Sequence, residues 1–204
     1  MFEPFSKIRW EIMQNFIFQC NPEDKIIIDL GAGNPAITDG IYCKKRIKVD
    51  VNPSTNPDIV CDLEKGIPVD DNSVDICVAS EFLEHIYHSK KLISEIKRIL
   101  KPYGILILSV PNICSLKYRF AFLIGKIPAH AAKADMFYKD DRRGHIRDYN
   151  FKEIEILLNM FDFEIMESRS DGLSFKGKNN NSTFCFTKDL WRFCNNKGKS
   201  SKVK

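Results

Sequence analysis

Residues 26–33 read Ile-Ile-Ile-Asp-Leu-Gly-Ala-Gly, and this stretch decides the fold of the chain. Three β-branched residues in a row predict a buried strand. The two glycines after it allow a tight backbone turn and a close approach to a ligand, which a Cβ would obstruct. Such a turn lies at the carboxyl end of a strand, where open α/β sheets bind their ligands. Because a Gly-x-Gly turn alone is weak evidence, the interpretation depends on the segments C-terminal to it.

Strand-like and helix-like segments alternate after this turn. Arg46–Val49 predicts a second strand that ends at Asp50, and Val74–Ala79 and Ile105–Val110 predict two more. A helical pattern over roughly Lys90–Leu100 separates the last two strands. This alternation implies βαβ units and a mostly parallel sheet.

The order of the motifs resembles the class I S-adenosylmethionine-dependent methyltransferases. The matching segments span roughly Lys25 to Arg169 and read, in order, IIIDLGAGNP, KVDVNP, CDLEKGIP, VDICVASEFLEH, LKPYGILILSVPN and GHIRDYNFKEIEILLNMFDFEI. The resemblance implies an α/β fold, with a Rossmann-like, seven-stranded, mostly parallel sheet, an antiparallel final strand and helices on both faces. The chain departs from the family at Pro35, where a third glycine is common.

The length of 204 residues predicts one domain. We expect this domain over residues 1–192, with an insertion at about 113–143 that forms a substrate lid or cap, and a basic flexible tail over 193–204. The tail lysines account for the net charge of +4, so the nearly neutral remainder is weak evidence for nucleic-acid binding.

The ends of the predicted domain show further patterns. Phe5–Gln19 predicts an amphipathic helix with Phe5, Ile8, Ile12 and Phe16 near one face. Phe151–Met160 predicts a second helix, for which Asn150 and Glu153 have the spacing of a capping box. Segments 163–167 and 183–187 alternate like the final antiparallel strands.

Seven single cysteines and the lack of a Cys-x-x-Cys pair make a thiolate zinc site improbable. The odd number of cysteines, without a leader-like segment, predicts a reducing, cytoplasmic location. No apolar run is long enough to span a membrane.

The resemblance implies a cofactor site at the ends of the first strands. Asp29 and the amides around Gly31 and Gly33 would contact the methionine part of S-adenosylmethionine. Asp50 would bind the ribose hydroxyls, because a carboxylate is a strong bidentate acceptor.

The next two strands complete this implied site. Asp62 would take the adenine amino group, with the Leu63 amide beside it. Ser80 and Glu81 would line the floor near the transferring methyl group. For any single acid, a helix cap or a loop contact is the alternative role.

Glu81, Glu84 and His85 are spaced so that a helix beginning here would project all three from one face. Carboxylates and imidazoles that converge in this way can hold Mg, Mn or Zn, and His145 is a candidate fourth ligand. This pattern resembles two metal-using branches of the family, the ubiquinone-pathway O-methyltransferases and the small-RNA 3′-terminal 2′-O-methyltransferases. A metal-free role for His85 or His145 as general base or positioning group is equally open, and a structural role is the third alternative.

Three features favour O-methylation of a hydroxyl on a small metabolite, glycan or lipid-linked sugar. Pro111-Asn112, the basic and apolar stretch Leu116–Lys126 and Gly144-His145-Ile146-Arg147 together resemble methyltransferases encoded with polysaccharide enzymes. The cations of that stretch suit a phosphate-bearing or membrane-associated acceptor, unless it is an ordinary surface helix.

Three other functions remain open. They are a metal-dependent RNA 3′-terminal 2′-O-methyltransferase, a catalytically inactive methyltransferase-like binding module and a nicotinamide dehydrogenase. The motif order after the glycine turn argues against the last of these.

Overall fold

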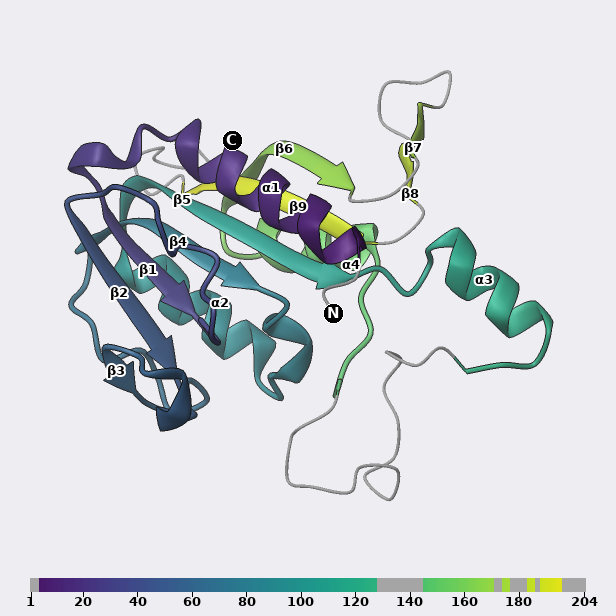
Figure 1. Cartoon of the computed structure of the whole chain (residues 1–204), viewed down its shortest axis with the longest axis horizontal. Helices are drawn as coiled ribbons and strands as arrows, with labels where there is room; N and C mark the ends of the chain where they lie inside the picture. Colours follow the sequence, from purple (N-terminus) through teal and green to yellow (C-terminus); the bar gives the residue numbers. More distant parts are fainter. Residues whose placement is uncertain (1–3, 128–144, 171–173, 177–182, 186–187, 196–204) are drawn as a thin grey trace, which may run out of the picture.

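A central sheet of seven strands organises the protein, in the order β3-β2-β1-β4-β5-β9-β6 (Figure 1). This computed structural model describes residues 4–127, 145–170, 174–176, 183–185 and 188–195. The strands of the sheet are β1 (Ile26–Leu30), β2 (Lys45–Asp50), β3 (Ile59–Val60), β4 (Val74–Ser80), β5 (Leu100–Pro111), β6 (Phe163–Ser170) and β9 (Lys188–Asn195). The first five pair in parallel, and β9 runs antiparallel to both β5 and β6. The predicted fold class, with its antiparallel final strand, is confirmed.

The two faces of the sheet are covered by different helices (Figure 1). Helix α1 (Pro4–Phe18) packs on the face that includes Ile27, whereas α2 (Ser89–Ile99) and α4 (Phe151–Asn159) pack on the face that includes Ile28. Successive residues of a strand point to opposite faces, so neighbours in β1 enter different cores. The isoleucine run of the opening motif is therefore buried on both sides, as parallel sheets require.

The helix boundaries agree with the sequence, and the buried face of α1 agrees in part. We expected Phe5, Ile8, Ile12 and Phe16 near one face. Phe16 is fully buried with Met13 and Ile17, and Ile12 packs against this cluster, but Ile8 is 42% exposed. Apolar residues occur around most of this helix. Its own spacing therefore did not determine which side would pack against β5 and β9.

The predicted last strand was misplaced. Thr183–Cys185 forms β8, which pairs with β7 (Ser174–Lys176) in a separate two-stranded sheet. The antiparallel strand of the main sheet is β9 instead, and it extends to Asn195. Residues 193–195 thus belong to a strand, and the remainder of the predicted tail, 196–204, lies outside the described residues.

A long excursion leaves the sheet after β5 and returns before α4. The Ile113 amide donates to the Tyr149 carbonyl at 2.9 Å, and Asn112 and Tyr149 form an isolated parallel bridge. Between these ends, the structure describes α3 (Leu116–Leu123) and the chain to residue 127. The rest of the predicted insertion, to residue 143, lies outside the described residues.

Three short 3-10 helices complete the described elements: η1 (Pro22–Asp24), η2 (Pro53–Thr55) and η3 (Leu83–His85). Within the described ranges, no helix has the length and apolar character needed to cross a membrane.

The capping box that begins α4 makes a stability prediction. The Asn150 side chain accepts from the Glu153 amide, and the Glu153 carboxylate accepts from the Asn150 amide. Replacing Asn150 with Ala should lower the free energy of unfolding by about 1 kcal/mol in a urea titration. Asn159→Ala, at the other end of α4, is the control. Equal effects of the two changes would show that the cap does not stabilise the helix.

Candidate cofactor and acceptor site

The residues assigned to the cofactor lie along one edge of the sheet. They come after the carboxyl ends of β3, β2, β1 and β4, which are consecutive strands in the sheet. Neighbouring strands are about 4.8 Å apart, so the four ends form a strip of roughly 14 Å. The strand order reverses direction at β1, where open α/β sheets bind ligands.

The two glycines of the turn after β1 have different surroundings. Gly31 has φ +66°, and a Cβ built there would lie 2.3 Å from the Phe82 ring, so a neighbouring side chain excludes any larger residue. Gly33 has φ +62°. Apart from its own chain neighbours, no atom of the described residues lies within 4 Å of the place that its Cβ would take. Gly33 therefore borders open space, which a ligand could approach, whereas Gly31 accommodates Phe82.

Asp50 connects the glycine turn to the end of β2. One carboxylate oxygen accepts from the Gly33 amide at 2.9 Å, and the other accepts from the Asn52 amide at 2.8 Å. On the adjacent strand, the Cys61 amide donates to the Asp50 carbonyl, which places Asp62 one residue beyond this contact. Asp62 accepts from the Glu64 amide at 3.1 Å, and Leu63 is buried in the core. The acids predicted for ribose and adenine thus lie at neighbouring strand ends.

Asp29 does not face the open edge. Its side chain is 1% exposed, and one carboxylate oxygen accepts from the Thr38 hydroxyl at 2.8 Å and from the Thr38 amide at 3.3 Å. Burial raises the pKa of Asp29 from 3.8 to about 6, despite these hydrogen bonds. In this structure Asp29 orders the loop between β1 and β2 through Thr38, and its contact with the cofactor stays a prediction.

The predicted helix face beginning at Glu81 does not form. Glu81 has φ +51°, and the chain enters η3 two residues later, so Glu81 does not join the group that contains Glu84. Its carboxylate lies 3.1 Å from the Arg9 guanidinium of α1. The Ser109 hydroxyl supports this turn, with contacts of 3.1 Å to both the Ser80 hydroxyl and the Glu81 amide.

Arg9 and Ser109 contact Glu81 in the candidate site, and the sequence prediction did not include them. Ser109 was detectable as the one polar residue within the apolar run Ile105–Val110. No local sequence pattern marks Arg9, because its contact with Glu81 depends on how α1 packs against the sheet.

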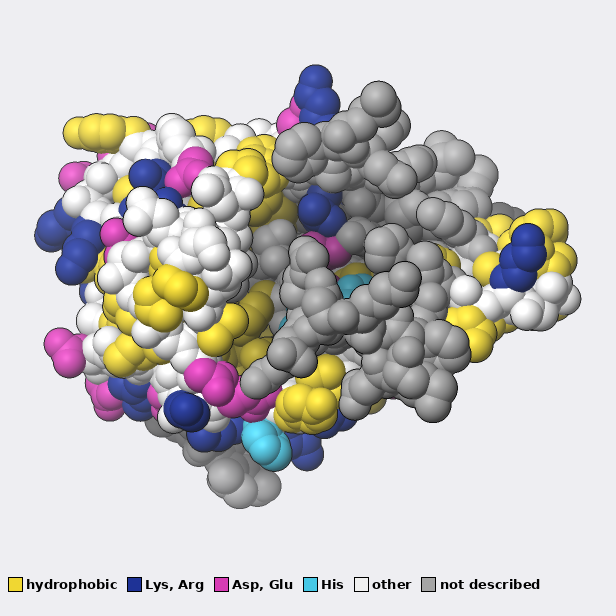
Figure 2. All heavy atoms as spheres, turned by 60° about the horizontal axis from the view of Figure 1, so that its bottom comes forward, with side chains coloured by type: hydrophobic (Ala, Val, Ile, Leu, Met, Phe, Trp, Pro, Cys, Tyr) yellow, Lys and Arg dark blue, Asp and Glu magenta, His cyan; other side chains and the backbone are white. Residues whose placement is uncertain are grey.

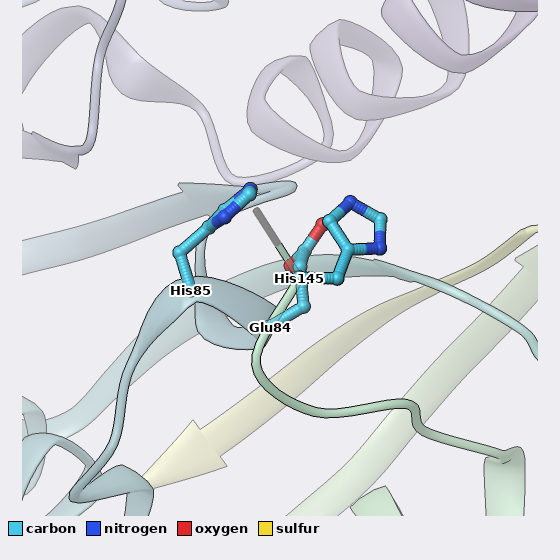
Figure 3. A group of neighbouring side chains, drawn as sticks. All are labelled: Glu84, His85 and His145. Atoms are coloured by element: carbon cyan, nitrogen blue, oxygen red, sulfur yellow. The ribbon is translucent and has the colours of Figure 1, made fainter. Parts of the chain in front are cut away.

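Glu84, His85 and His145 converge beside the end of β4 (Figure 3). One ligand atom from each lies within 4.8 Å of the others. The His145 Nε2 is 3.9 Å from a Glu84 carboxylate oxygen, and the two imidazole centroids are 5.0 Å apart in an edge-to-face arrangement. The Glu84 side chain is only 1% exposed, so its charge is poorly solvated and favours a nearby cation or proton donor.

The backbone brings His145 to this position. The Glu84 carbonyl accepts from the amides of Ile146 and Arg147 at 2.9 and 3.2 Å. The returning end of the excursion is thereby joined to η3. Of the four predicted metal ligands, three come together, and Glu81 does not.

Comparisons with known proteins show what this chain is similar to. The family model described as "Methyltransferase domain" matches residues 28–108. A protein of Mycolicibacterium smegmatis, named as a probable S-adenosylmethionine-dependent methyltransferase, is 24% identical over 166 residues, which are 77% of this chain and 58% of that protein. The chain thus spans little more than half the length of this relative.

Solved structures share the fold at low identity. A protein of Bacillus halodurans superposes with a TM-score of 0.65 at 13% identity, over 91% of this chain and 99% of the other. The N-methyltransferase NodS of Bradyrhizobium japonicum, in complex with S-adenosylhomocysteine, gives a TM-score of 0.60 at 15% identity, over 95% and 88% of the two chains. The chain is therefore similar to S-adenosylmethionine-dependent methyltransferases in its central part and shares their fold over most of its length.

The buried carboxyl of Asp29 should make stability depend on pH. Between the unfolded pKa of 3.8 and the folded pKa of about 6, only the unfolded chain releases this proton, so folding becomes less favourable as pH rises. The total cost is about 3 kcal/mol above pH 6. Asp29→Asn removes this cost, and its stability advantage over the wild type should grow by about that amount between pH 4 and pH 6.5.

Urea titrations at several pH values measure this difference. Asp24→Asn, which changes an exposed acid, is the control. If the difference in unfolding free energy between Asp29→Asn and the wild type does not vary with pH, the folded Asp29 has an ordinary pKa.

Proposed function

We propose that the protein transfers a methyl group from S-adenosylmethionine to a hydroxyl on a small metabolite, a glycan or a lipid-linked sugar. The observation that carries this proposal is the pair formed by His145 and the buried Glu84 beside the end of β4. An imidazole next to a carboxylate is suited to take the proton of a hydroxyl nucleophile. Such a base is of most use for an acceptor that is protonated at neutral pH, as alcohols are.

Each residue of the site has a separate role in this reaction. The cofactor supplies an electrophilic methyl group, so the protein mainly has to orient the acceptor and remove its proton. Asp50 and Asp62 bind the nucleoside part, beside the open space at Gly33. His145 is the general base, and Glu84 holds its imidazole and stabilises the protonated form. His85 packs edge-on against His145 and limits its rotation.

A divalent cation is the second candidate for the same three side chains. Two imidazole nitrogens and one carboxylate oxygen within 4.8 Å of one another fit a transition metal. This donor set suits Zn or Mn better than Mg, which prefers oxygen ligands. When bound, such an ion would act as a Lewis acid that lowers the pKa of the acceptor hydroxyl. Glu81 would take no part, since its carboxylate pairs with Arg9.

The remaining alternatives have less support. An RNA 3′-terminal 2′-O-methyltransferase would use the same metal ligands, but the nearly neutral chain body offers little attraction for RNA. An inactive binding module would not require the open cofactor edge at Gly33. The free cysteines of the described residues, Cys20, Cys43, Cys61, Cys77 and Cys114, suit a reducing compartment such as the cytosol.

The ribose assignment predicts the effect of changing Asp50. Asp50→Ala should weaken S-adenosylhomocysteine binding by about 1–3 kcal/mol, because a charge-assisted hydrogen bond is lost. Calorimetry measures this affinity, and Asp70→Ala, at an exposed acid away from the sheet edge, is the control. Since Asp50 also binds the Gly33 and Asn52 amides, melting temperatures must show that the variant is folded at the assay temperature. Unchanged affinity in folded protein would refute the assignment.

Replacing His145 distinguishes a catalytic role, as base or as metal ligand, from a structural one. If His145 is the base, His145→Ala should reduce methyl transfer to hydroxyl acceptors by roughly a hundredfold or more. The affinity for S-adenosylhomocysteine should stay unchanged. His88→Ala, at an exposed histidine, is the matched control. Equal loss of transfer and of cofactor affinity would instead indicate a structural role.

Metal titration into chelator-treated protein saturated with S-adenosylhomocysteine completes the test. Stoichiometric binding of Zn or Mn that disappears in both Glu84→Gln and His145→Ala would establish the metal-assisted form. If the heat of metal binding is still observed in both variants, the ion binds at another site.

A further inference from the structure

Helix α3 stands apart from the sheet and its covering helices (Figure 1). It begins four residues after Asn112, where the excursion leaves β5, and Tyr118 is its one fully described buried side chain, at 7% exposure. The segment after α3 is described to residue 127. Most of this helix is therefore available to a partner.

The outward side of α3 is apolar. Leu116, Phe120 and Leu123 are spaced by four and three residues, so they share one face of the helix. They are 45%, 64% and 83% exposed, and Ile124 and Ile127 continue the surface at 52% and 68%. An ordinary surface helix turns such a stripe toward the core, whereas α3 turns it outward. We call these five residues the α3 apolar surface.

Positive charge accompanies the α3 apolar surface. The segment 113–127 contains three cations, Lys117, Arg119 and Lys126, and no acidic residue. Arg119 and Lys126 are exposed. The right-hand end of Figure 2, where α3 lies, shows hydrophobic side chains with Lys and Arg side chains among them.

We propose that α3 docks the protein on the surface of a lipid bilayer that contains anionic lipids. A short helix with exposed aromatic and aliphatic side chains and only basic charges has two features of interfacial binding, an apolar surface and positive charge. Its exposed apolar side chains are not confined to one face, since Phe122 is also 49% exposed. The apolar side chains enter the boundary between headgroups and acyl chains, and the cations face lipid phosphates. The helix lies on the membrane and does not cross it.

Charge and composition favour a lipid bilayer over a second copy of this chain or a nucleic acid as the partner of α3. Two copies of α3 in a symmetric dimer would bring like charges together, with no acid in the segment to offset them. A nucleic acid would contact cations and stacked aromatic rings, but leucine and isoleucine make up most of the exposed apolar surface. A bilayer accommodates both the aliphatic side chains and the cations.

Docking through α3 would also orient the candidate site. The excursion that carries α3 is closed by the Ile113–Tyr149 hydrogen bond, and its returning end brings His145 to Glu84. A helix bound to the membrane would therefore hold the acceptor side of the site near the bilayer, where a lipid-linked acceptor would be found. Membrane docking does not depend on the proposed O-methylation, and it can be tested without an acceptor.

Vesicle co-sedimentation of the full chain tests the proposal. We expect binding to phosphatidylcholine vesicles that contain roughly one-third phosphatidylglycerol, and weaker binding as salt is added, because salt screens the attraction to the anionic headgroups. Phe120→Ser combined with Leu123→Ser should lower the partition coefficient at least about tenfold, since two apolar side chains no longer enter the lipid. Arg119→Glu combined with Lys126→Glu should lower it by about fivefold or more for each cation.

Two matched controls separate α3 from general surface properties. Ile156→Ser with Met160→Ser changes exposed apolar residues at α4, and Lys44→Glu with Lys45→Glu changes exposed cations near β2. Both should leave the partition coefficient unchanged, and melting temperatures should show that every variant is folded. Equal losses in the α3 variants and the controls would overturn the proposal.

Other outcomes would also overturn it. Equal binding to pure phosphatidylcholine would refute the role of anionic lipid. A dimer in analytical ultracentrifugation that the Phe120→Ser, Leu123→Ser variant dissociates, together with no vesicle binding, would assign the surface to a second copy. Tight binding of single-stranded RNA that Arg119→Glu, Lys126→Glu abolishes, without vesicle binding, would assign it to nucleic acid. Because none of these measurements uses methyl transfer, failure here would leave the proposed chemistry untouched.

Discussion

The close approach of Phe82 to Gly31 is the constraint on which the site depends. The ring occupies the space that a Cβ on Gly31 would need, and the Gly31 amide bonds to the Val49 carbonyl. Two residues later, the Gly33 amide bonds to the Asp50 carboxylate. The turn after β1 is thus held between the end of β2 and the start of η3. The same turn leaves open space at Gly33, beside the edge proposed to bind the cofactor.

A second connection joins the cofactor edge to the acceptor side. The Glu84 carbonyl binds the amides after His145, and the Glu84 carboxylate lies near the His145 imidazole. Backbone and side chain of one residue therefore position a histidine that is about sixty residues away in the sequence. Helix α3 belongs to the same excursion. The proposed membrane contact and the proposed base therefore lie on one segment of chain, which leaves the sheet edge after β5 and returns to it at Tyr149.

The burial of Asp29 beside this edge is retained at a cost in stability. Burial of Asp29 raises its pKa to about 6, so its charge at neutral pH opposes folding, yet it orders the loop between β1 and β2 through Thr38. The Glu84 carboxylate is also buried, and it lies beside the imidazoles of His85 and His145. Proteins commonly accept such costs where residues must be preorganised for binding or catalysis.

The sequence by itself determined the parallel sheet, the glycine turn, the acids at the strand ends and the capping box of α4. Each of these rests on local patterns, namely β-branched runs, glycine conformations and short-range hydrogen bonds. Only the tertiary structure decided which face of α1 is buried, that β9 rather than β8 completes the sheet, and that Glu81 pairs with Arg9 instead of joining Glu84. It also decided that His145 meets Glu84. Those outcomes depend on contacts between residues far apart in the chain, and a local sequence pattern does not predict such contacts.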